Sequence, residues 1–315
     1  MRNFLKNILP PPVRTFMREV KNVLDSVWRV EADLSAKLDK ISGENDALRE
    51  QLNEQGKALK QLQEVLGNFT GTDSSSKTYD AARDARDQAL QAKRQASEAV
   101  WGEIFNNVTA DSSWLKNRSF SPGRWALGYP ALYVLYRVLN EFQPQSILEL
   151  GLGQSTHMTA QYTAAHTDVS HYVVEHDQAW IDVFLKSFSL PQQTQIVRLN
   201  LEMAPYKEAE SVRSYAGFAD SFSGKHFDLI LIDGPLGGDM KIYSRVDVLR
   251  LLPGILSDRF VIMLDDYNRP QEQNTGHEME KILTEHSIAY AYGNYSGDKD
   301  MRVWCSLDAL FLISM

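Results

Sequence analysis

The sequence predicts an α/β protein whose C-terminal half forms a mostly parallel sheet with an antiparallel last strand, preceded by an N-terminal coiled coil. Segments typical of strands and helices alternate from Ser146 onward, as in a parallel sheet covered by helices on both faces. Apolar residues recur at heptad spacing between residues 23 and 66. Hydrophobic residues make up 43% of the 315 positions, which is enough for a large core.

Residues 1–22 form a basic amphipathic segment. Five basic residues stand there against one acidic residue, Glu19, and apolar residues lie between them. Two interpretations remain open. The segment either contacts an anionic membrane surface or docks as an amphipathic helix on the protein or its dimer partner. The basic residues are Arg2, Lys6, Arg14, Arg18 and Lys21.

Residues 23–66 show the heptad pattern of a coiled coil. Ten of the thirteen a and d positions are apolar, and the spacing of three and four residues continues without interruption. Asn45 at an a position favours a parallel two-stranded register, so we expect a homodimer. A single amphipathic helix is the alternative. The series is Leu24, Val27, Glu31, Leu34, Leu38, Ile41, Asn45, Leu48, Leu52, Gln55, Leu59, Leu62 and Leu66.

Two connecting regions follow the coiled coil. Residues 67–78 are rich in Gly, Ser and Thr and predict a flexible linker. Residues 79–145 predict a helical connector and the first helices of the C-terminal domain. They include a polar helix over 79–105, a loop over 112–128 with aromatic anchors, and a helix over 130–142.

The domain over residues 146–315 has five short apolar strands separated by helices. The antiparallel pair expected at its end closes the edge of the sheet. In such sheets ligands bind at the carboxyl ends of the strands. The strands are expected at 147–150, 171–175, 195–199, 227–233 and 260–265, with the closing pair near 288–291 and 309–313. The helices are expected at 156–166, 178–188, 206–221, 243–256 and 274–285.

A glycine turn follows the first strand of this domain. Gly151 and Gly153 allow the backbone to approach a ligand, and Ser155 is placed to cap the next helix. The third glycine of a dinucleotide-binding turn is missing, because Thr156 holds its position. The carboxylate of Glu149 would repel a pyrophosphate and suits a ligand with an ammonium group.

Two further strand ends contribute polar residues. Glu175 ends the second strand, where a carboxylate can accept hydrogen bonds from both hydroxyls of a ribose. Asn200 follows the third strand, where the edge of an adenine would lie. With the glycine turn, these positions predict a site for a cationic, ribose-bearing cofactor.

The motif Glu149-Leu150-Gly151-Leu152-Gly153-Gln154-Ser155 and the strand order resemble the class I S-adenosylmethionine-dependent methyltransferases. The resemblance covers about 170 residues and implies a Rossmann-like fold, S-adenosyl-L-methionine as the cofactor, and methyl transfer. Asp233, Asp265 and Asp266 resemble the acidic positions of the metal-dependent catechol-type O-methyltransferases. The sequences 233–237 and 265–269 also resemble the glucuronoxylan O-methyltransferases.

The same three aspartates follow two strands that we expect to be neighbours, so their carboxylates should lie close together. Two interpretations remain open. In the first, Asp233, Asp265 and Asp266 bind Mg²⁺ or Mn²⁺, and the metal lowers the pKa of an acceptor hydroxyl. In the second, Asp233 is the catalytic base without a metal.

Other side chains near these strand ends are candidates for catalysis or substrate binding. His277 is the favoured histidine, because a loop between Tyr267 and Gly276 could cover the site. Arg269 could bind a carboxylate of the substrate or pair with nearby acidic residues. The lysine of the catechol-type enzymes has no counterpart at residues 234–236.

The sequence therefore predicts a transferase, an O-methyltransferase that acts on a sugar hydroxyl of a surface glycan or its precursor, in polysaccharide biosynthesis. The alternatives are methylation of a small hydroxylated metabolite and a non-catalytic coiled-coil scaffold. The net charge of −8 argues against nucleic acid as a partner. The single cysteine, Cys305, and the lack of a signal peptide or an 18-residue apolar run predict a cytoplasmic protein, with peripheral contact at the inner membrane face as an option.

Overall fold

The computed structural model describes residues 57, 73–123 and 125–314. The chain divides into two units, Met1–Asp84 and Ala85–Met315, and the second contains the sheet. The basic segment 1–22 and, apart from Lys57, the predicted coiled coil 23–66 lie outside the described residues, so both remain predictions from the sequence.

Helix α2, Asp73–Thr109, begins inside the segment predicted as a linker. Residues 73–78, the last six of the predicted linker, are therefore helical. They form the first turns of a long helix in spite of their three serines. Over residues 79–109 of α2 most side chains are exposed, as the polar sequence predicts. Near its end, however, Phe105 is 1% exposed and belongs to the core of the second unit.

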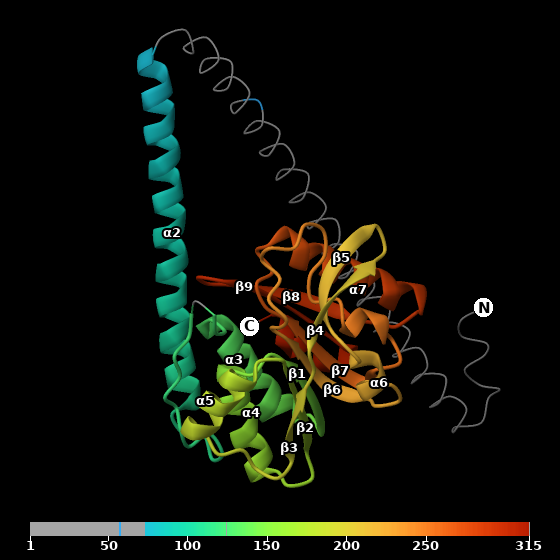
Figure 1. Ribbon diagram of the computed structural model, residues 1–315. Helices are drawn as coiled ribbons and strands as arrows, with labels where there is room; N and C mark the ends of the chain where they lie inside the picture. The colour runs from blue at the N-terminus through green and yellow to red at the C-terminus, as the bar shows by residue number, and fades with distance from the viewer. Residues whose placement is uncertain (1–56, 58–72, 124, 315) are drawn as a thin grey trace, which may run out of the picture. The chain divides into compact units, whose positions relative to one another are not determined.

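The sheet has seven strands in the order β3-β2-β1-β6-β7-β9-β8 (Figure 1). The first five in this order pair in parallel, whereas β9 pairs antiparallel with β7 and with β8. The expected α/β sheet, mostly parallel with an antiparallel end, is confirmed. The strands are β1 (Ser146–Leu150), β2 (Ser170–Glu175), β3 (Thr194–Arg198), β6 (Phe227–Ile232), β7 (Leu256–Leu264), β8 (Ala291–Ser296) and β9 (Asp300–Cys305).

Helices cover both faces of this sheet because its central strands are apolar on both sides. In β1, Ile147 belongs to one core cluster, while Leu148 and Leu150 belong to the other. The first face carries α3 (Tyr129–Arg137), the π-helical turn η2 (Val138–Phe142), α4 (Gln154–Ala165), α5 (Gln178–Ser187) and η4 (Leu307–Ile313). The second carries α6 (Phe218–Phe222), η3 (Val248–Arg250) and α7 (Pro270–Glu285).

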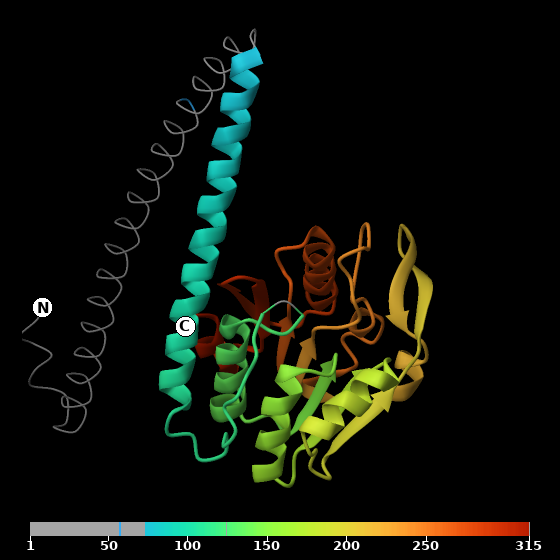
Figure 2. The ribbon, with the colours of Figure 1, turned by 60° about the vertical axis from the view of Figure 1, so that its left-hand side comes forward.

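A β-hairpin replaces most of the helix predicted at 206–221. Strands β4 (Leu201–Tyr206) and β5 (Ala209–Tyr215) pair antiparallel beside the main sheet (Figure 2). Lys207 in the turn has a φ of +50°, and Val212 and Tyr215 bury side chains that favour strands. The prediction was wrong here because this hairpin packs its apolar side chains on the second face of the sheet.

The helix predicted at 243–256 was also wrong. Only the short turn η3 is helical there. Arg245 has a left-handed backbone with a φ of +54°, and Pro253 disfavours a helical conformation of the residue before it. Both features stop a continuous helix, and the segment is a loop whose side chains, including those of Val246 and Val248, are buried.

The antiparallel pair at the end of the chain exists, but its position differs from the prediction. The two strands, β8 and β9, join through a short turn around Gly297, whereas residues 309–313 belong to the 3₁₀ helix η4. Apolar η4 residues such as Leu312 are buried in the core, which explains why an apolar run was mistaken for a strand.

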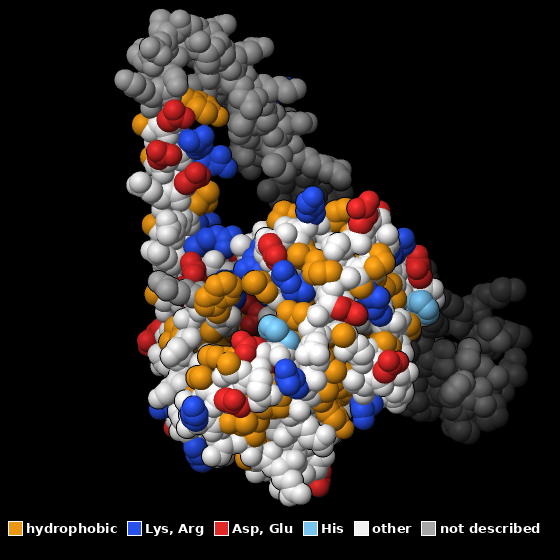
Figure 3. All heavy atoms as spheres, viewed as in Figure 1, with side chains coloured by type: hydrophobic (Ala, Val, Ile, Leu, Met, Phe, Trp, Pro, Cys, Tyr) orange, Lys and Arg blue, Asp and Glu red, His pale blue; other side chains and the backbone are white. Residues whose placement is uncertain are grey.

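The surface view in Figure 3 shows acidic and basic side chains interspersed over this face of the domain. Among the described residues, no helix is both long enough and apolar enough to cross a membrane.

Candidate functional site

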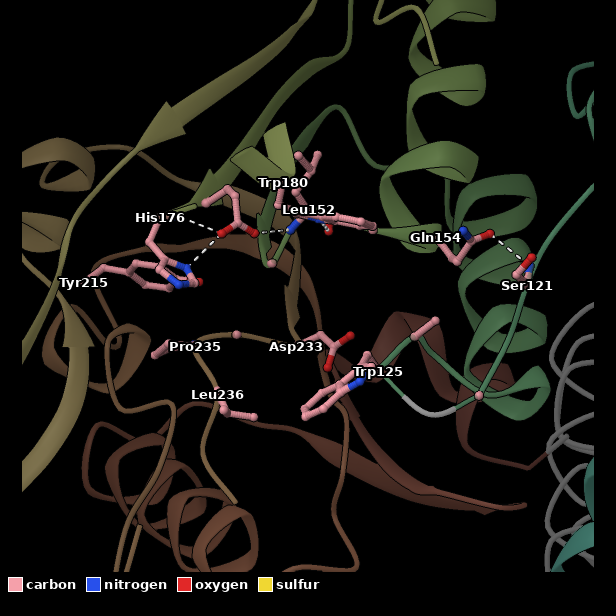
Figure 4. A pocket seen from close by; sticks show the side chains of 16 residues that line it. Ser121, Trp125, Leu152, Gln154, His176, Trp180, Tyr215, Asp233, Pro235 and Leu236 are labelled. Carbon is pink, nitrogen blue, oxygen red and sulfur yellow. Dashed lines mark hydrogen bonds and ion pairs between the residues drawn. The ribbon is translucent and has the colours of Figure 1, made fainter. Parts of the chain in front are cut away.

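A cavity of about 360 Å³ opens at the carboxyl ends of β1, β2 and β6, where an open α/β sheet binds its ligands (Figure 4). In the view of Figure 4, Asp233, Trp125 and Leu236 lie at one side, and His176 and Trp180 at another. The cavity is lined by Ser121, Gly123, Trp125, Ala126, Gly151, Leu152, Gly153, Gln154, Glu175, His176, Trp180, Tyr215, Asp233, Gly234, Pro235 and Leu236.

The glycine turn after β1 forms part of this lining, as predicted. Gly151 has a φ of +106°, and a Cβ there would lie 3.3 Å from the backbone carbonyl of Asp233. A Cβ on Gly153 would meet no heavy atom within 4 Å, so this residue faces open space. The turn therefore brings bare backbone to the cavity, which lets a ligand approach closely.

Ser155 does not have the predicted role. Its side chain is buried beneath the start of α4 and does not line the cavity. The hydroxyl of Thr156 instead accepts a hydrogen bond from the backbone N–H of Gly153 at 3.2 Å. The residue that we took for a break in a dinucleotide motif thus stabilises the turn.

Glu149 also differs from its predicted role. Side chains alternate along β1, and Glu149 points to the face that α4 covers, where it is 0% exposed. Its carboxylate accepts hydrogen bonds from the hydroxyls of Thr156, at 2.6 Å, and Thr159. Because Glu149 does not line the cavity, it supports the first turn of α4 from below and does not face a cofactor ammonium group.

Glu175 lines the cavity, as predicted, and its position is firmly fixed. One carboxylate oxygen accepts from the backbone N–H of Leu152 at 3.2 Å. The other accepts from the N–H groups of His176 and Asp177, at 2.7 and 2.9 Å. The imidazole Nδ1 of His176 lies 2.8 Å from the same oxygen. A buried carboxylate held in this way is preorganised for a ligand with hydroxyl groups.

Asn200 lies outside the cavity. Its side chain is exposed, and its carbonyl accepts a hydrogen bond from Ala216 at 2.8 Å, where the β4–β5 hairpin leaves the sheet. Flat side chains on the lining include those of Tyr215 and Trp180, and the Trp180 indole donates to the carbonyl of Leu152 at 2.7 Å. The sequence did not indicate Tyr215, because its strand was predicted as a helix.

The three predicted aspartates do come together. Ligand oxygens of Asp233, Asp265 and Asp266 all lie within 4.8 Å of one another. Only Asp233 lines the cavity, with a side chain 16% exposed, while Asp265 and Asp266 are buried behind it. We call these three residues, with the buried Glu272 nearby, the acidic cluster.

Three basic side chains pair with the acidic cluster. The guanidinium of Arg245 lies 2.7 Å from Asp266 and 3.3 Å from Asp233, and Arg269 lies 2.9 Å from Asp266. The ammonium of Lys299 lies 2.5 Å from Asp265 and 3.4 Å from Asp266. Glu272 adds a fourth carboxylate, 3.5 Å from Arg269 and 3.9 Å from Arg245.

The spacing of the cluster is compatible with a divalent cation, and one buried oxygen of Asp265 has no hydrogen-bond partner among the described residues. The charge of the cluster, however, is nearly balanced already by the three basic side chains. A cation would have to displace Lys299 or Arg245 from carboxylates that they now contact. The cluster therefore can hold a metal but does not need one to keep its carboxylates together.

The electrostatics of Asp233 follow from this surrounding. Burial, and next the charge of Asp265, raise the pKa of Asp233 well above its usual range, while Arg245 and Lys299 act in the opposite direction. The raised pKa makes the ionised Asp233 carboxylate a stronger base toward a ligand proton than an ordinary aspartate.

His277 is not at the site. It lies on an exposed face of α7 and does not line the cavity. The loop that was expected to cover the site between Tyr267 and Gly276 is largely the start of α7, which begins at Pro270. His176 is the histidine that lines the cavity. Arg269 pairs with Asp266 and Glu272, which is one of its two predicted roles.

Sequence patterns missed Arg245, Lys299 and Trp125. Arg245 lies in a loop twelve residues after Asp233, Lys299 lies in a turn much further along the chain, and no motif indicates either residue. Trp125 is one of the aromatic residues of the loop 112–128 that the sequence predicts as anchors, yet its side chain is 81% exposed at the cavity. A large exposed aromatic residue can be recognised only once the fold shows that it stays uncovered.

A scan against protein-family models and a search of the curated proteins find no match. Solved structures that the chain is similar to include the O-methyltransferase TomG from Streptomyces achromogenes, with SAM. The identity is 12%, the match covers 69% of this chain and 98% of that one, and the TM-score is 0.44. Another is an O-methyltransferase from Bacillus cereus with SAH, at 13% identity, 70% and 97% coverage and a TM-score of 0.40.

A third similar structure is the methyltransferase PaMTH1 from Podospora anserina with SAH, at 15% identity, 70% and 94% coverage and a TM-score of 0.36. Because the identities lie below 25% and the TM-scores below 0.5, we infer the function from the residues of the cavity and not from these proteins.

Proposed function

We propose that this chain is an S-adenosylmethionine-dependent O-methyltransferase. The observation behind the proposal is the cavity itself, where a fixed carboxylate, Glu175, and a glycine turn lie together with Asp233 at the ends of β1, β2 and β6. Two carboxylates on the lining favour a cationic ligand and disfavour a pyrophosphate.

The lining fits the chemical parts of this cofactor. The Glu175 oxygen that accepts only from Leu152 can accept a further hydrogen bond from a ribose hydroxyl. The turn at Gly153 leaves room for the chain that links ribose to the amino acid. Tyr215 and Trp180 offer flat apolar surfaces for a purine ring. The bound cofactor supplies a methyl group on a sulfonium, and the electron pair of the broken methyl–sulfur bond stays on sulfur.

Asp233 is the group that acts on the acceptor. The acceptor oxygen forms the new bond to the methyl carbon, and its proton passes to the carboxylate of Asp233, which gives it up to solvent after release. Arg245 fixes the orientation of Asp233 through an ion pair at 3.3 Å. Orientation of the acceptor oxygen in line with the methyl group supplies the rest of the acceleration.

A cation bound to Asp233, Asp265 and Asp266 would lower the pKa of an acceptor hydroxyl that it coordinates. The metal-dependent mechanism is tested by an assay of methyl transfer after EDTA treatment, repeated after addition of Mg²⁺ or Mn²⁺. Activity that survives EDTA leaves Asp233 as the base without a metal.

For the acceptor we propose a sugar hydroxyl of a glycan or its precursor. Trp125, Pro235 and Leu236 make an apolar wall at the cavity beside Asp233, and an exposed tryptophan ring suits the flat C–H face of a pyranose. A phenolic metabolite fits the same wall, so it is the competing acceptor in the test.

The test of the cofactor is calorimetry with S-adenosylhomocysteine. We expect binding, and no heat at high micromolar ligand would overturn the proposal and favour the non-catalytic scaffold. The Asp233→Asn variant should keep this binding while methyl transfer falls by about 10²- to 10⁴-fold. Asp220→Asn, an exposed aspartate of α6, is the matched control and should be fully active.

The test of the acceptor compares methyl glycosides and glycan fractions with dihydroxybenzoates as methyl acceptors. Trp125→Ala should raise the KM for the preferred acceptor by about three- to tenfold while S-adenosylhomocysteine affinity stays unchanged. Met203→Ala removes an exposed apolar side chain from β4 and serves as the control. Transfer only to the phenols would rule out the sugar acceptor.

A further inference from the structure

Helix α2 makes a dense set of contacts with the turn between β8 and β9. The Arg94 guanidinium pairs with both carboxylate oxygens of Asp300, at 3.1 and 3.2 Å, and donates to the carbonyl of Asp298 at 3.2 Å. Ser97 and Trp101 both donate to the carbonyl of Ser296, at 2.8 and 3.2 Å. One polar face of α2 thus binds the whole turn.

Glu98 adds a contact that depends on a glycine. Its carboxylate accepts a hydrogen bond from the N–H of Asp298 at 3.0 Å and another from the N–H of Tyr129. A Cβ on Gly297 would collide with this carboxylate and with Pro130. The turn therefore approaches α2 as closely as its backbone allows.

The same turn inserts Lys299 into the acidic cluster. The Lys299 ammonium contacts Asp265 and Asp266 and donates to the carbonyl of Ala126 at 3.1 Å, and Ala126 lines the cavity. Its side chain is 10% exposed. The backbone on both sides of Lys299 is hydrogen-bonded as well. The N–H of Asp298 donates to Glu98, and the carbonyl of Asp300 accepts from the N–H of Tyr267 at 2.7 Å.

We propose that α2 is a positioning element of the active site, which acts through Arg94 and Glu98 on the β8–β9 turn and holds Lys299 in the acidic cluster. The inference rests on the proposed function for its effect on methyl transfer, but not for the placement of Lys299. In this arrangement Lys299 supplies one of the positive charges that keep Asp233, Asp265 and Asp266 in place.

The physical consequence follows from the charges. Withdrawal of Lys299 leaves Asp265, which is 2% exposed, without the ammonium group that it contacts. A buried carboxylate without a partner is costly, so the cluster rearranges. Asp233 belongs to the same cluster and lines the cavity. A loosened α2 therefore changes the group that faces the acceptor without touching the cofactor side at Glu175.

The first test measures where Lys299 is, independently of activity. The chain is acetylated briefly, and mass spectrometry gives the extent of modification of Lys299 relative to Lys281, which is 59% exposed. We expect strong protection of Lys299 in the original chain. In the double variant Arg94→Ala with Glu98→Ala, relative acetylation should rise by about fivefold or more, because the turn opens locally.

The control for this test lies on the same helix. Arg86→Ala with Asp87→Ala removes one basic and one acidic exposed residue of α2, and no contact of either is seen in the described part of the chain. It should leave Lys299 as protected as before. If circular dichroism shows that the Arg94 and Glu98 variant is unfolded, the milder Arg94→Gln with Ser97→Ala takes its place.

The second test asks whether α2 acts through Lys299. Lys299→Met should lower kcat for methyl transfer and leave S-adenosylhomocysteine affinity unchanged. The Arg94 and Glu98 changes should lower kcat as well, yet add little in the Lys299→Met background, since both remove the same interaction. Arg94→Lys, which keeps the positive charge at this position, should have a kcat between those of the original chain and the Arg94→Ala with Glu98→Ala variant.

The outcomes separate the two proposals. Full protection of Lys299 in a folded Arg94 and Glu98 variant overturns the positioning role of α2, and so do additive losses of kcat. Absence of cofactor binding in the original chain overturns the proposed function. The acetylation result still decides whether α2 holds Lys299 in the acidic cluster.

Discussion

At the scale of single residues, the backbone at Gly151 joins the glycine turn to the segment that positions Asp233. The N–H of Gly151 donates to Val174 at 2.9 Å, and the N–H of Asp233 donates to Leu150 at 2.9 Å. Gly151 has a φ of +106°, and a Cβ there would crowd the backbone of Asp233 at 3.3 Å. Gly151 therefore lies where the glycine turn and the segment that begins at Asp233 meet in the cavity lining.

We predict that Gly151→Ala lowers the free energy of unfolding by about 1–3 kcal/mol, because a Cβ adds crowding to an unfavourable φ. It should also weaken S-adenosylhomocysteine binding in calorimetry. Gly224→Ala is the matched control, since Gly224 also has a positive φ, +75°, but no heavy atom lies within 4 Å of its Cβ position. Equal losses of binding in the two variants would contradict a special role for Gly151.

Residues also show where sequence patterns reach their limit. The glycine turn, Glu175 and the three aspartates were predicted correctly as parts of one region, because strand ends of a parallel sheet meet at one edge. Glu149 was placed wrongly, because its orientation depends on which face of β1 is covered by α4. Arg245 combines a left-handed backbone with buried ion pairs, and no local sequence pattern indicates such a conformation.

At the scale of elements, the hairpin β4–β5 is tied to the loop before η3 by Asp247. One oxygen of this buried carboxylate accepts from the N–H of Tyr215 at 2.7 Å, and the other has no partner among the described residues. Burial raises the pKa of Asp247 to about 7. Tyr215 lines the cavity, so this connection also holds one wall of the site.

The sign of the pH effect follows from that raised pKa. Below the unfolded-state pKa, near 4, Asp247 is protonated in both states, and its contribution to stability is fully present. Between about pH 4 and pH 7 only the folded state keeps the proton, so the contribution is lost as pH rises. Above pH 7 the folded protein contains a buried charge.

We therefore predict that Asp247→Asn is more favourable for stability, compared with the original chain, at pH 8 than at pH 5. The difference in unfolding free energy between variant and original chain should grow by on the order of 2 kcal/mol over this range. Urea titrations at both pH values measure it. Asp220→Asn should give the same difference at both, and a flat result for Asp247→Asn would mean that this carboxyl group does not keep its proton at pH 5.

Elements with strong periodicity or long apolar runs were predicted well, and those that depend on tertiary contacts were not. Strand β6, with the sequence FDLILI, is buried at every position except the half-buried Asp228, so its apolar pattern alone defines it. The β4–β5 hairpin and η4 have apolar residues that either a helix or a strand can bury. Whether these segments become helical or extended depends on the face of the sheet against which they pack.

At the scale of the whole molecule, the heptad pattern of residues 23–66 predicts that the chain is a dimer. The pattern precedes α2, the helix that we propose as a positioning element, so a dimer would bring two such helices into one assembly. Asn45 at an a position favours a parallel two-stranded register, in which two facing amides can satisfy each other.

We predict that the full chain sediments with twice its mass of 35.8 kDa. Replacement of Leu38 and Leu52 by Glu puts charges at two a positions and should give a monomer, because burial of these carboxylates in the seam costs more than the remaining apolar contacts supply. Lys40→Glu changes a charge at an outer position and should leave the dimer intact. A monomeric original chain would exclude the coiled-coil dimer. A monomeric Leu38 and Leu52 variant that keeps Lys299 protected from acetylation would show that α2 holds the β8–β9 turn within one chain, without help from a second copy.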